Sequence, residues 1–448
     1  MREKWNNRAF RRLLWPLVIE QALAITIGIA DTVMVASVGE FAVSGVSLVD
    51  AINQLLIIAF SALATGGAVV VSQYIGRRNE KGSRLASRQL IYVSAGASLF
   101  IMLLSLILRR PILAAVYGNI AEDVMAAAET YFWLTAISYP FLAAYNAAAS
   151  LFRSAGNSKI TMLIAIVINV LNVAGTAVLI FVFRMGVAGA AISTLASRIV
   201  GALVLTGMLI ADRRSPISLE GLFKVRLDLV TVRSILNVGV PNGLENSMFQ
   251  FGKILLSRVF TTFGTAAIAA NAISGSITSF SFMPANAFAI AMLTIVGQCI
   301  GAKEYDSAHY FTIKLMKLTH VTVIGFAVLT AVLMGPLIGV FNLSPEARSL
   351  AVRFLWVHCI MSPIAWPCSF TLPSALRAAG DSRFVMIVAS ISMWAVRVSF
   401  AYILAYPAGL GPIGVWIAMV SDWCVRAAFF VHRWLRGRWR GKQVLADG

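Results

Sequence analysis

Twelve long apolar runs limit what this chain can fold into more than any other feature of its sequence. Hydrophobic residues make up 59% of its 448 residues and charged residues 12%, whereas a soluble domain has about 25% charged residues. An apolar run of about 20 residues is long enough to cross a bilayer as a helix. The sequence therefore predicts an all-α polytopic membrane protein with 12 transmembrane helices. The predicted spans are 13–38, 47–74, 89–108, 130–152, 160–183, 187–211, 234–260, 266–300, 312–341, 350–376, 384–404 and 412–432.

The net charge of +18 would suit a nucleic-acid-binding protein, but the positions of the basic residues favour another explanation. If the N-terminus is cytoplasmic and the twelve spans alternate, 27 Lys and Arg residues fall on the cytoplasmic side and 5 on the other side. This distribution follows the positive-inside rule. We therefore expect a multi-pass protein of the plasma (inner) membrane, with both termini cytoplasmic, the lipid bilayer as its surroundings and no nucleic-acid partner.

The chain repeats itself at an interval of about 225 residues. Each half carries six predicted spans, an even number, so both halves have the same orientation in the membrane. We expect two six-helix lobes related by a pseudo-two-fold axis along the membrane normal, as in transporters built from parallel repeats. The matching positions are Pro16 and Pro241, Glu20 and Glu245, Gln73–Gly76 and Gln298–Gly301, Arg153–Gly156 and Arg377–Gly380, Gly186 and Gly411, and Gly189 and Gly414.

The repeat predicts the domain organisation. An N-terminal lobe covers 1–211, a cytoplasmic linker 212–233, a C-terminal lobe 234–433 and a basic cytoplasmic tail 434–448. Two similar lobes with a site at the membrane midplane suit alternating access, in which the lobes rock about that site. We expect the protein to be a monomer.

The first span carries two carboxylates in an otherwise apolar run. A charged side chain in a membrane costs about 2.5–3.5 kcal/mol on insertion scales, which makes it a functional candidate. Glu20 and Asp31 share one helix face because they are close to a whole number of turns apart. Glu20 recurs as Glu245 and, with Gln21, is a candidate for the seam or cavity between the lobes. Asp31 has no acidic counterpart in the second half, so it is the first candidate for ion coupling.

Polar side chains of the fifth and sixth spans are the predicted partners of Asp31. Asn169, Asn172 and Thr176 are spaced three and four residues apart and so share a helix face, and Thr194 lies in the sixth span. With Asp31 they form the predicted cation-coupling site for H⁺ or Na⁺. Two plainer interpretations stay open: Asp31 caps its helix at the membrane interface, and the asparagines join neighbouring helices.

The seventh span contains the densest polar stretch of any span. We predict that its Glu245 and Lys253 neutralise each other or pair across the seam between lobes; a coupling or substrate role is the alternative. Apolar side chains nearby give a weaker hypothesis, a substrate cavity suited to aromatic cations. The polar cluster is Glu245, Asn246, Gln250 and Lys253, and the cavity candidates are Met248, Phe249, Phe280 and Met283.

Four further charged residues lie in or near spans. Asp422 and Arg426 have the spacing of a local ion pair near the cytoplasmic end. Arg198 and Arg397 either lie at the membrane interface or join that pair.

Signals of catalysis are missing from the sequence. It has no P-loop, nucleophile elbow or HExxH motif, and its four cysteines stand singly without a CxxC pair. We expect a protein that is not an enzyme and has no cofactor, with no metal site beyond a Na⁺ at Asp31. Energy for transport would come from an ion gradient.

Six motifs occur in order along the chain: Pro16…Glu20-Gln21…Asp31-Thr-Val-Met, Ser72-Gln-Tyr-Ile-Gly76, Arg153-Ser-Ala-Gly-Asn157, Gly186-Val-Ala-Gly-Ala-Ala-Ile192, Pro241…Glu245-Asn…Gln250-Phe-Gly-Lys253 and Ala269-Ala-Asn-Ala-Ile273. This ordered set resembles the multidrug and toxic compound extrusion (MATE) transporters along nearly the whole chain. That resemblance implies two six-helix lobes and Na⁺- or H⁺-coupled export of organic cations and related drugs. It also implies a coupling role for Asp31, with polar partners at Asn172, Thr176 and Thr194.

The chain also departs from the family's pattern. Many members carry a second carboxylate where this chain has Thr176, and another branch has a seventh-helix Glu where this chain has Phe249. The span 350–376 contains no Asp or Glu. These departures leave the coupling ion open and argue against a second-lobe ion site of that other branch's kind.

The predicted function is cation-coupled antiport that exports small amphipathic, cationic compounds by alternating access. The alternative within transport is a flippase for a lipid-linked oligosaccharide or peptidoglycan precursor of the same superfamily. Twelve spans and a single midspan lysine, Lys253, argue against it. A channel or a membrane-embedded enzyme is less compatible with the sequence.

Overall fold

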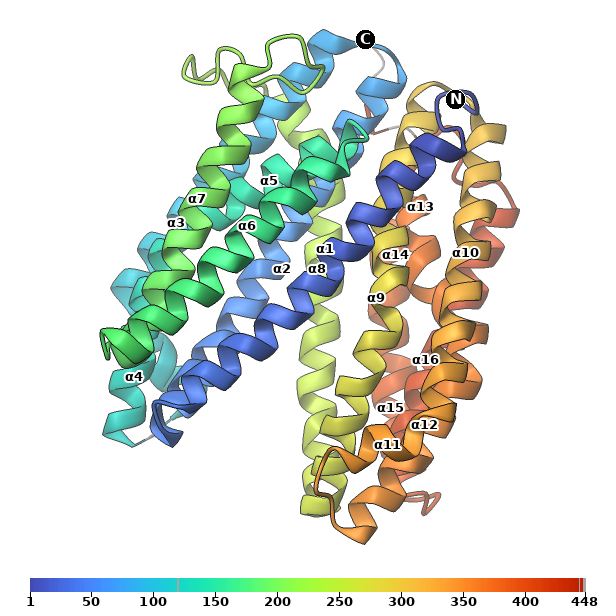
Figure 1. Cartoon of the computed structure of the whole chain (residues 1–448). Helices are drawn as coiled ribbons and strands as arrows, with labels where there is room; N and C mark the ends of the chain where they lie inside the picture. Colours follow the sequence, from blue (N-terminus) through green and yellow to red (C-terminus); the bar gives the residue numbers. More distant parts are fainter. Residues whose placement is uncertain (119–120, 443, 446–448) are drawn as a thin grey trace. The chain divides into compact units, whose positions relative to one another are not determined.

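The computed structural model of the chain describes residues 1–118, 121–442 and 444–445. All regular secondary structure in these residues is helical (Figure 1). The first half contains α1 (Asn7–Ala36), α2 (Glu40–Gly76), α3 (Glu80–Tyr117), α4 (Glu122–Ile137), α5 (Tyr139–Ser154), α6 (Ser158–Ala177), η1 (Val178–Val182) and α7 (Gly186–Ala211). The second half contains α8 (Leu229–Thr261), α9 (Thr265–Gly301), α10 (Tyr305–Val332), α11 (Met334–Gly339), α12 (Pro345–Trp366), η2 (Pro367–Thr371), α13 (Leu372–Ala378), α14 (Ser382–Ile391), η3 (Ser392–Val398), α15 (Ser399–Ala405) and α16 (Pro412–Leu435). The segments η1, η2 and η3 are π-helical.

Every predicted span coincides with helical structure, and ten helical segments among the described residues are long and apolar enough to cross a membrane. The other two predicted spans differ for separate reasons. The fourth is broken at Ser138, which separates α4 from α5. The seventh, α8, is a continuous helix of 33 residues with a polar middle. The all-α polytopic prediction is confirmed.

Contacts within the chain divide it into two compact units. The first-half unit comprises Trp5–Gly243 with Leu445–Gly448, and the second-half unit comprises Met1–Lys4 with Leu244–Val444. The division falls inside α8, so this helix contributes its first turns to one unit and its remainder to the other. The predicted domain boundaries stay a prediction.

Equivalent positions of the repeat have equivalent backbone conformations. Gly186 and Gly411 both have positive φ, at 56° and 60°, directly before or at the start of the last long helix of their half. Arg78 and Lys303, which follow the repeated Gln-x-Ile-Gly motif, also share a positive φ of 56° and 59°. Non-glycine residues rarely adopt this conformation. Its recurrence at matching positions shows that the sequence repeat is also a structural repeat.

The same pairing of charges occurs in both units. Arg153 Nη1 lies 2.8 Å from Glu20 Oε1, and Arg377 Nη2 lies 2.7 Å from Glu245 Oε2. Thr161 also donates to Glu20 Oε2 at 3.0 Å. All of these side chains come from the repeated motifs or lie beside them. The pairs neutralise the repeated glutamates within each unit.

Internal prolines affect two long helices differently. Pro284 lies inside α9, which runs without interruption from Thr265 to Gly301. In α3 the backbone departs from helical geometry at Leu108 (φ −103°, ψ 15°). Pro111 follows three residues later, and a proline ring disturbs the preceding turn because it clashes with backbone there and removes an N–H donor.

The segment between α7 and α8 is held against α3 of the first-half unit. Gln89 Nε2 donates to the carbonyl of Arg226 at 2.7 Å, and the Tyr92 hydroxyl donates to the carbonyl of Leu222 at 2.6 Å. The backbone N–H of Asp228 donates in turn to Gln89 Oε1 at 3.2 Å. These bonds fix the course of the chain just before α8 begins.

Helix α2 crosses the start of α8 in close backbone contact, with Gly66 of α2 against Ile235 and Gly239 of α8. A Cβ placed on Gly66 would lie 2.4 Å from the carbonyl oxygen of Ile235 and 2.9 Å from the backbone nitrogen of Gly239. Backbone cannot move aside as a flexible side chain can. The glycine at this position is therefore required by the close approach of the two helices.

We predict that Gly66→Ala destabilises the protein by about 1–3 kcal/mol, because overpacking forces a backbone shift. Gly96→Ala is the matched control, since a Cβ at Gly96 meets no atom within 4 Å. It should be neutral or stabilise by about 0.5–1 kcal/mol through the higher helix propensity of alanine. Thermal unfolding of the purified variants in detergent measures both. Equal melting temperatures for the two variants would contradict the close crossing.

Candidate cation-coupling site

Asp31 meets polar side chains of α6 and α7 within the first-half unit. The Asn172 amide is assigned with its nitrogen toward Asp31, because this orientation satisfies both ends of the amide. Asn172 Nδ2 then donates to Asp31 Oδ1 at 3.0 Å and to Oδ2 at 3.2 Å. Thr194 Oγ1 donates to Asn172 Oδ1 at 3.2 Å. Asp31, Asn172 and Thr194 thus form one hydrogen-bonded chain across three helices.

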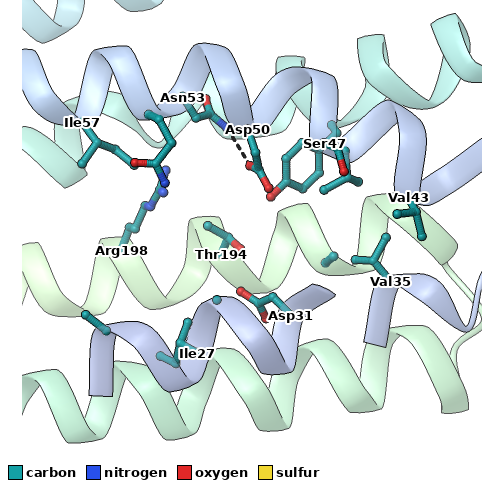
Figure 2. Close-up of a pocket in the computed structure, with 16 residues that line it drawn as sticks. Ile27, Asp31, Val35, Val43, Ser47, Asp50, Asn53, Ile57, Thr194 and Arg198 are labelled. Atoms are coloured by element: carbon teal, nitrogen blue, oxygen red, sulfur yellow. Dashed lines mark hydrogen bonds between the residues drawn. The ribbon is translucent and has the colours of Figure 1, made fainter. Parts of the chain in front are cut away.

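Asp31 and Thr194 border a pocket of about 240 Å³ in the same unit, and Asn172 lies outside its lining. Figure 2 shows Asp31 and Thr194 on one side of it and Asp50, on α2, on the other. The Arg198 side chain reaches from α7 across the pocket toward α2 (Figure 2). The rest of the lining is mixed. Its polar side chains are Ser47, Asn53, Gln54 and Tyr131, and its apolar ones are Ala24, Ile27, Val35, Val43, Val46, Ile57 and Ala190. Two carboxylates and one guanidinium give the pocket a formal charge of −1.

Asp50 is held by side chains that sequence reasoning did not select. Asn53 Nδ2 donates to Asp50 Oδ1 at 3.3 Å, and the Tyr131 hydroxyl donates to the same carboxylate. Tyr139 donates to Asn53 Oδ1 at 2.8 Å, which fixes the orientation of that amide. The sequence does contain a signal for Asp50. It is an aspartate in an apolar span, and Asn53, three residues later, lies on the same helix face. As for Asp31, a carboxylate in such a span is a functional candidate.

The other residues predicted as site residues in the first half are Asn169, Thr176, Glu20 and Gln21, and none of them lines the pocket. Thr176 is fully buried, and its hydroxyl has no hydrogen-bond partner in the part of the chain that the structure describes. Asn169 is half-buried one turn before Asn172. Gln21 is half-buried beside Glu20, whose carboxylate binds Arg153 and Thr161.

In the second-half unit, the predicted neutralisation of Glu245 by Lys253 is wrong. Glu245 instead accepts two hydrogen bonds from Arg377 Nη2, both 2.7 Å long. Arg377 lies 132 residues away in the sequence, on α13, and sequence spacing along α8 gives no sign of it. Lys253 forms no ion pair with any residue that the structure describes. Asn246 and Gln250 are half-buried on the same helix.

The predicted pair of Asp422 with Arg426 is confirmed, at 2.9 Å from Nε to Oδ1. Arg397 joins it, with Nη1 3.9 Å from Asp422 Oδ2. Arg198 does not, because it belongs to the pocket of the first-half unit and donates to Ser138 Oγ at 2.6 Å. Of the weaker cavity candidates, Phe249 contacts the Arg397 and Arg426 guanidinium groups. Met248 and Met283 are half-buried and Phe280 is exposed.

A carboxylate bound to an amide and a hydroxyl, in a small pocket inside a helical membrane unit, is a site that can take up and release a proton or a small cation. Among the described residues, no group of three or more His, Cys, Asp or Glu side chains could hold a metal ion. The fold and this site are those of a membrane transporter rather than an enzyme.

Comparison with known proteins identifies the family. The family model described as MatE matches the chain twice, at residues 16–178 and 241–403. The chain therefore belongs to the MatE family, whose members are transporters that extrude drugs and other small organic substrates. The interval between the two matches also confirms the repeat at 225 residues.

Relatives with related sequences cover nearly the whole chain. An uncharacterized transporter, YisQ, of Bacillus subtilis is 29% identical over 437 residues, covering 95% of this chain and 94% of that protein. "Probable multidrug resistance protein NorM" of Thermotoga maritima is 27% identical, covering 97% and 93%. A crystal structure of MATE in the bent conformation superposes with a TM-score of 0.89 at 20% identity, covering 96% of this chain and 95% of the other.

We predict that Arg198→Gln and Asp50→Asn each destabilise the protein by about 1–3 kcal/mol, because each removes one of two opposite, partly buried charges that attract each other. The double variant Asp50→Asn/Arg198→Gln should lose less than the sum of the two, since the attraction between these two charges can be lost only once. Thermal unfolding in detergent of the four proteins completes the double-mutant cycle. Additive losses would show that Asp50 and Arg198 do not interact.

Proposed function

We propose that the protein exports small amphipathic compounds, organic cations among them, in exchange for a cation that binds at Asp31. The observation that carries this proposal is the hydrogen-bonded chain of Asp31, Asn172 and Thr194 beside a pocket. Export follows from alternating access of two lobes, 1–211 and 234–433, within a monomer. Occupancy of Asp31 would favour one state of the transporter, and such linkage is what makes one flux drive the other.

The surroundings of Asp31 support H⁺ over Na⁺ as the coupling ion. Asn172 presents its N–H donor to both carboxylate oxygens, and the charged groups that act on Asp31 are Asp50 and Arg198. A hard cation requires several oxygen ligands, whereas a proton requires only one carboxylate oxygen.

We predict that a pH gradient imposed on proteoliposomes drives ethidium transport and that Asp31→Asn abolishes it, because an amide can neither bind nor release the coupling proton. The matched control is Asp123→Asn, the same substitution at an exposed aspartate at the start of α4, which should leave transport unchanged. Gradients of H⁺ and Na⁺ are applied separately. Transport driven by Na⁺ alone would replace H⁺ as the coupling ion, and transport driven by neither would end the antiport proposal.

We also propose that the protein lies in the plasma (inner) membrane with both termini cytoplasmic, on the charge distribution of the connecting segments. Green fluorescent protein folds in the cytoplasm and not after export in unfolded form. Its fusion after residue 442 should therefore give fluorescent cells, and an alkaline phosphatase fusion at the same place should be inactive. The opposite pair of results would invert the orientation.

A further inference from the structure

The second-half unit gathers more positive than negative charge around one point of α8. The group consists of Lys253 on α8, Arg397 on η3, and Asp422 and Arg426 on α16; we call it the cationic cluster. Arg397, Asp422 and Arg426 are at least nine-tenths buried, with exposed fractions of 7%, 0% and 2%. Three cations and one carboxylate leave a formal charge of +2.

Asp422 is hydrogen-bonded to the guanidinium group of Arg426. Its Oδ1 accepts from Arg426 Nε at 2.9 Å and from Ser392 Oγ at 2.6 Å. Arg426 Nη2 is further occupied by the backbone carbonyl of Ala389, at 3.2 Å. Asp422 is thus hydrogen-bonded to Arg426 and within ion-pair distance of Arg397, and this one carboxylate cannot balance the three cations of the cluster.

Arg397 has unused donor capacity although it is buried. Its Nε has no hydrogen-bond partner among the described residues, and its Nη1 is 3.9 Å from Asp422 Oδ2, beyond hydrogen-bonding distance. Lys253 makes no ion pair with any described residue, and the charged group that acts on it is Arg397, a second cation. The two like charges repel each other, and Arg397, which is buried, has also lost hydration. An anion between them would remove both costs.

The packing of α8 against η3 holds these two cations in place. A Cβ on Gly252 would lie 2.1 Å from Met393 Cε, so Gly252 allows α8 to approach η3 one residue before Lys253. The π-helical turn of η3 carries Arg397, and such turns occur often at functional sites. Lys253 is exposed and Arg397 is buried. The arrangement gives an anion one accessible and one buried donor.

Aromatic rings lie beside the same cations. The Phe249 ring is 5.3 Å from the Arg397 guanidinium carbon and 5.4 Å from that of Arg426, and Phe370 is 6.0 Å from Phe249, edge to face. Phe249 and Phe370 are both half-buried, so each ring has accessible surface. A ligand with an aromatic ring next to its acid group could pack against these rings.

We propose that the cationic cluster is a binding site for an aromatic organic anion, with Lys253 and Arg397 holding a carboxylate or sulfonate group. The site differs from the pocket at Asp31, whose formal charge has the opposite sign. As a substrate site it rests on the proposed export function; as a binding site it does not. Guanidinium and ammonium groups bind such acids through charge-assisted hydrogen bonds.

The test is equilibrium binding to the purified full-length chain in detergent, with two dyes that share one xanthene ring system. Fluorescein is anionic at neutral pH and rhodamine 123 is cationic. Lys253→Met, which removes the charge and keeps an unbranched side chain, should weaken fluorescein binding about tenfold or more, the effect of one hydrogen bond to a charged group. Lys253→Arg should retain the affinity. Neither variant should weaken rhodamine 123 binding.

Two outcomes would overturn the proposal: wild-type protein that does not bind fluorescein, or Lys253→Met protein that binds it as tightly as wild type does. Asp31→Asn is the variant that separates the two proposals. It should lose gradient-driven transport and keep its affinity for fluorescein. If wild-type protein transports nothing but binds fluorescein in a manner that depends on Lys253, the export function fails and the anion site stands.

Discussion

The partnering of charge inside an apolar surrounding is the constraint on which this structure depends. A polypeptide in lipid satisfies its backbone by forming helices, but a charged side chain needs a counter-charge or a polar pocket. Glu20 with Arg153 and Glu245 with Arg377 meet this need by direct ion pairs within single units. Asp31 is bound by the amide of Asn172 instead of a counter-charge. In the cationic cluster, three cations share one carboxylate. The sites that differ from simple pairing are those to which function is assigned.

The repeat makes that difference visible. Positions that recur in both halves, such as the paired glutamates and the glycines with positive φ, have the same contacts or conformation twice. These features belong to the scaffold. Asp31, Asp50 and Arg198 have no equivalent cluster of the same charge in the second-half unit, where Arg397 and Lys253 are basic. The two halves of the repeat thus carry charge clusters of opposite sign.

The spans, the repeat and the Asp422–Arg426 pair could all be predicted because each depends on residues close in sequence or on a regular interval. The predicted span 130–152 does not contain the break at Ser138, although Pro140, in the first turn of α5, is a sequence signal for the start of a new helix. Partners on other helices are harder to predict, because they depend on tertiary contacts. The sequence predicts that Glu245 pairs with Lys253 or across the seam, whereas its partner is Arg377, which is 132 residues away in the sequence. Asp50 has a signal in its own span, which the predicted site does not include.

The segment 222–228, which precedes α8, limits where the chain can accept insertions and deletions. Gln89 and Tyr92 of α3 bind its backbone at three points, and Asp228 is one of them. The length of this connecting segment is therefore fixed by its hydrogen bonds to α3. An inserted tag or loop would displace hydrogen-bonded backbone there, whereas a flexible linker would accommodate it. Length changes in natural variants should accordingly fall outside 222–228.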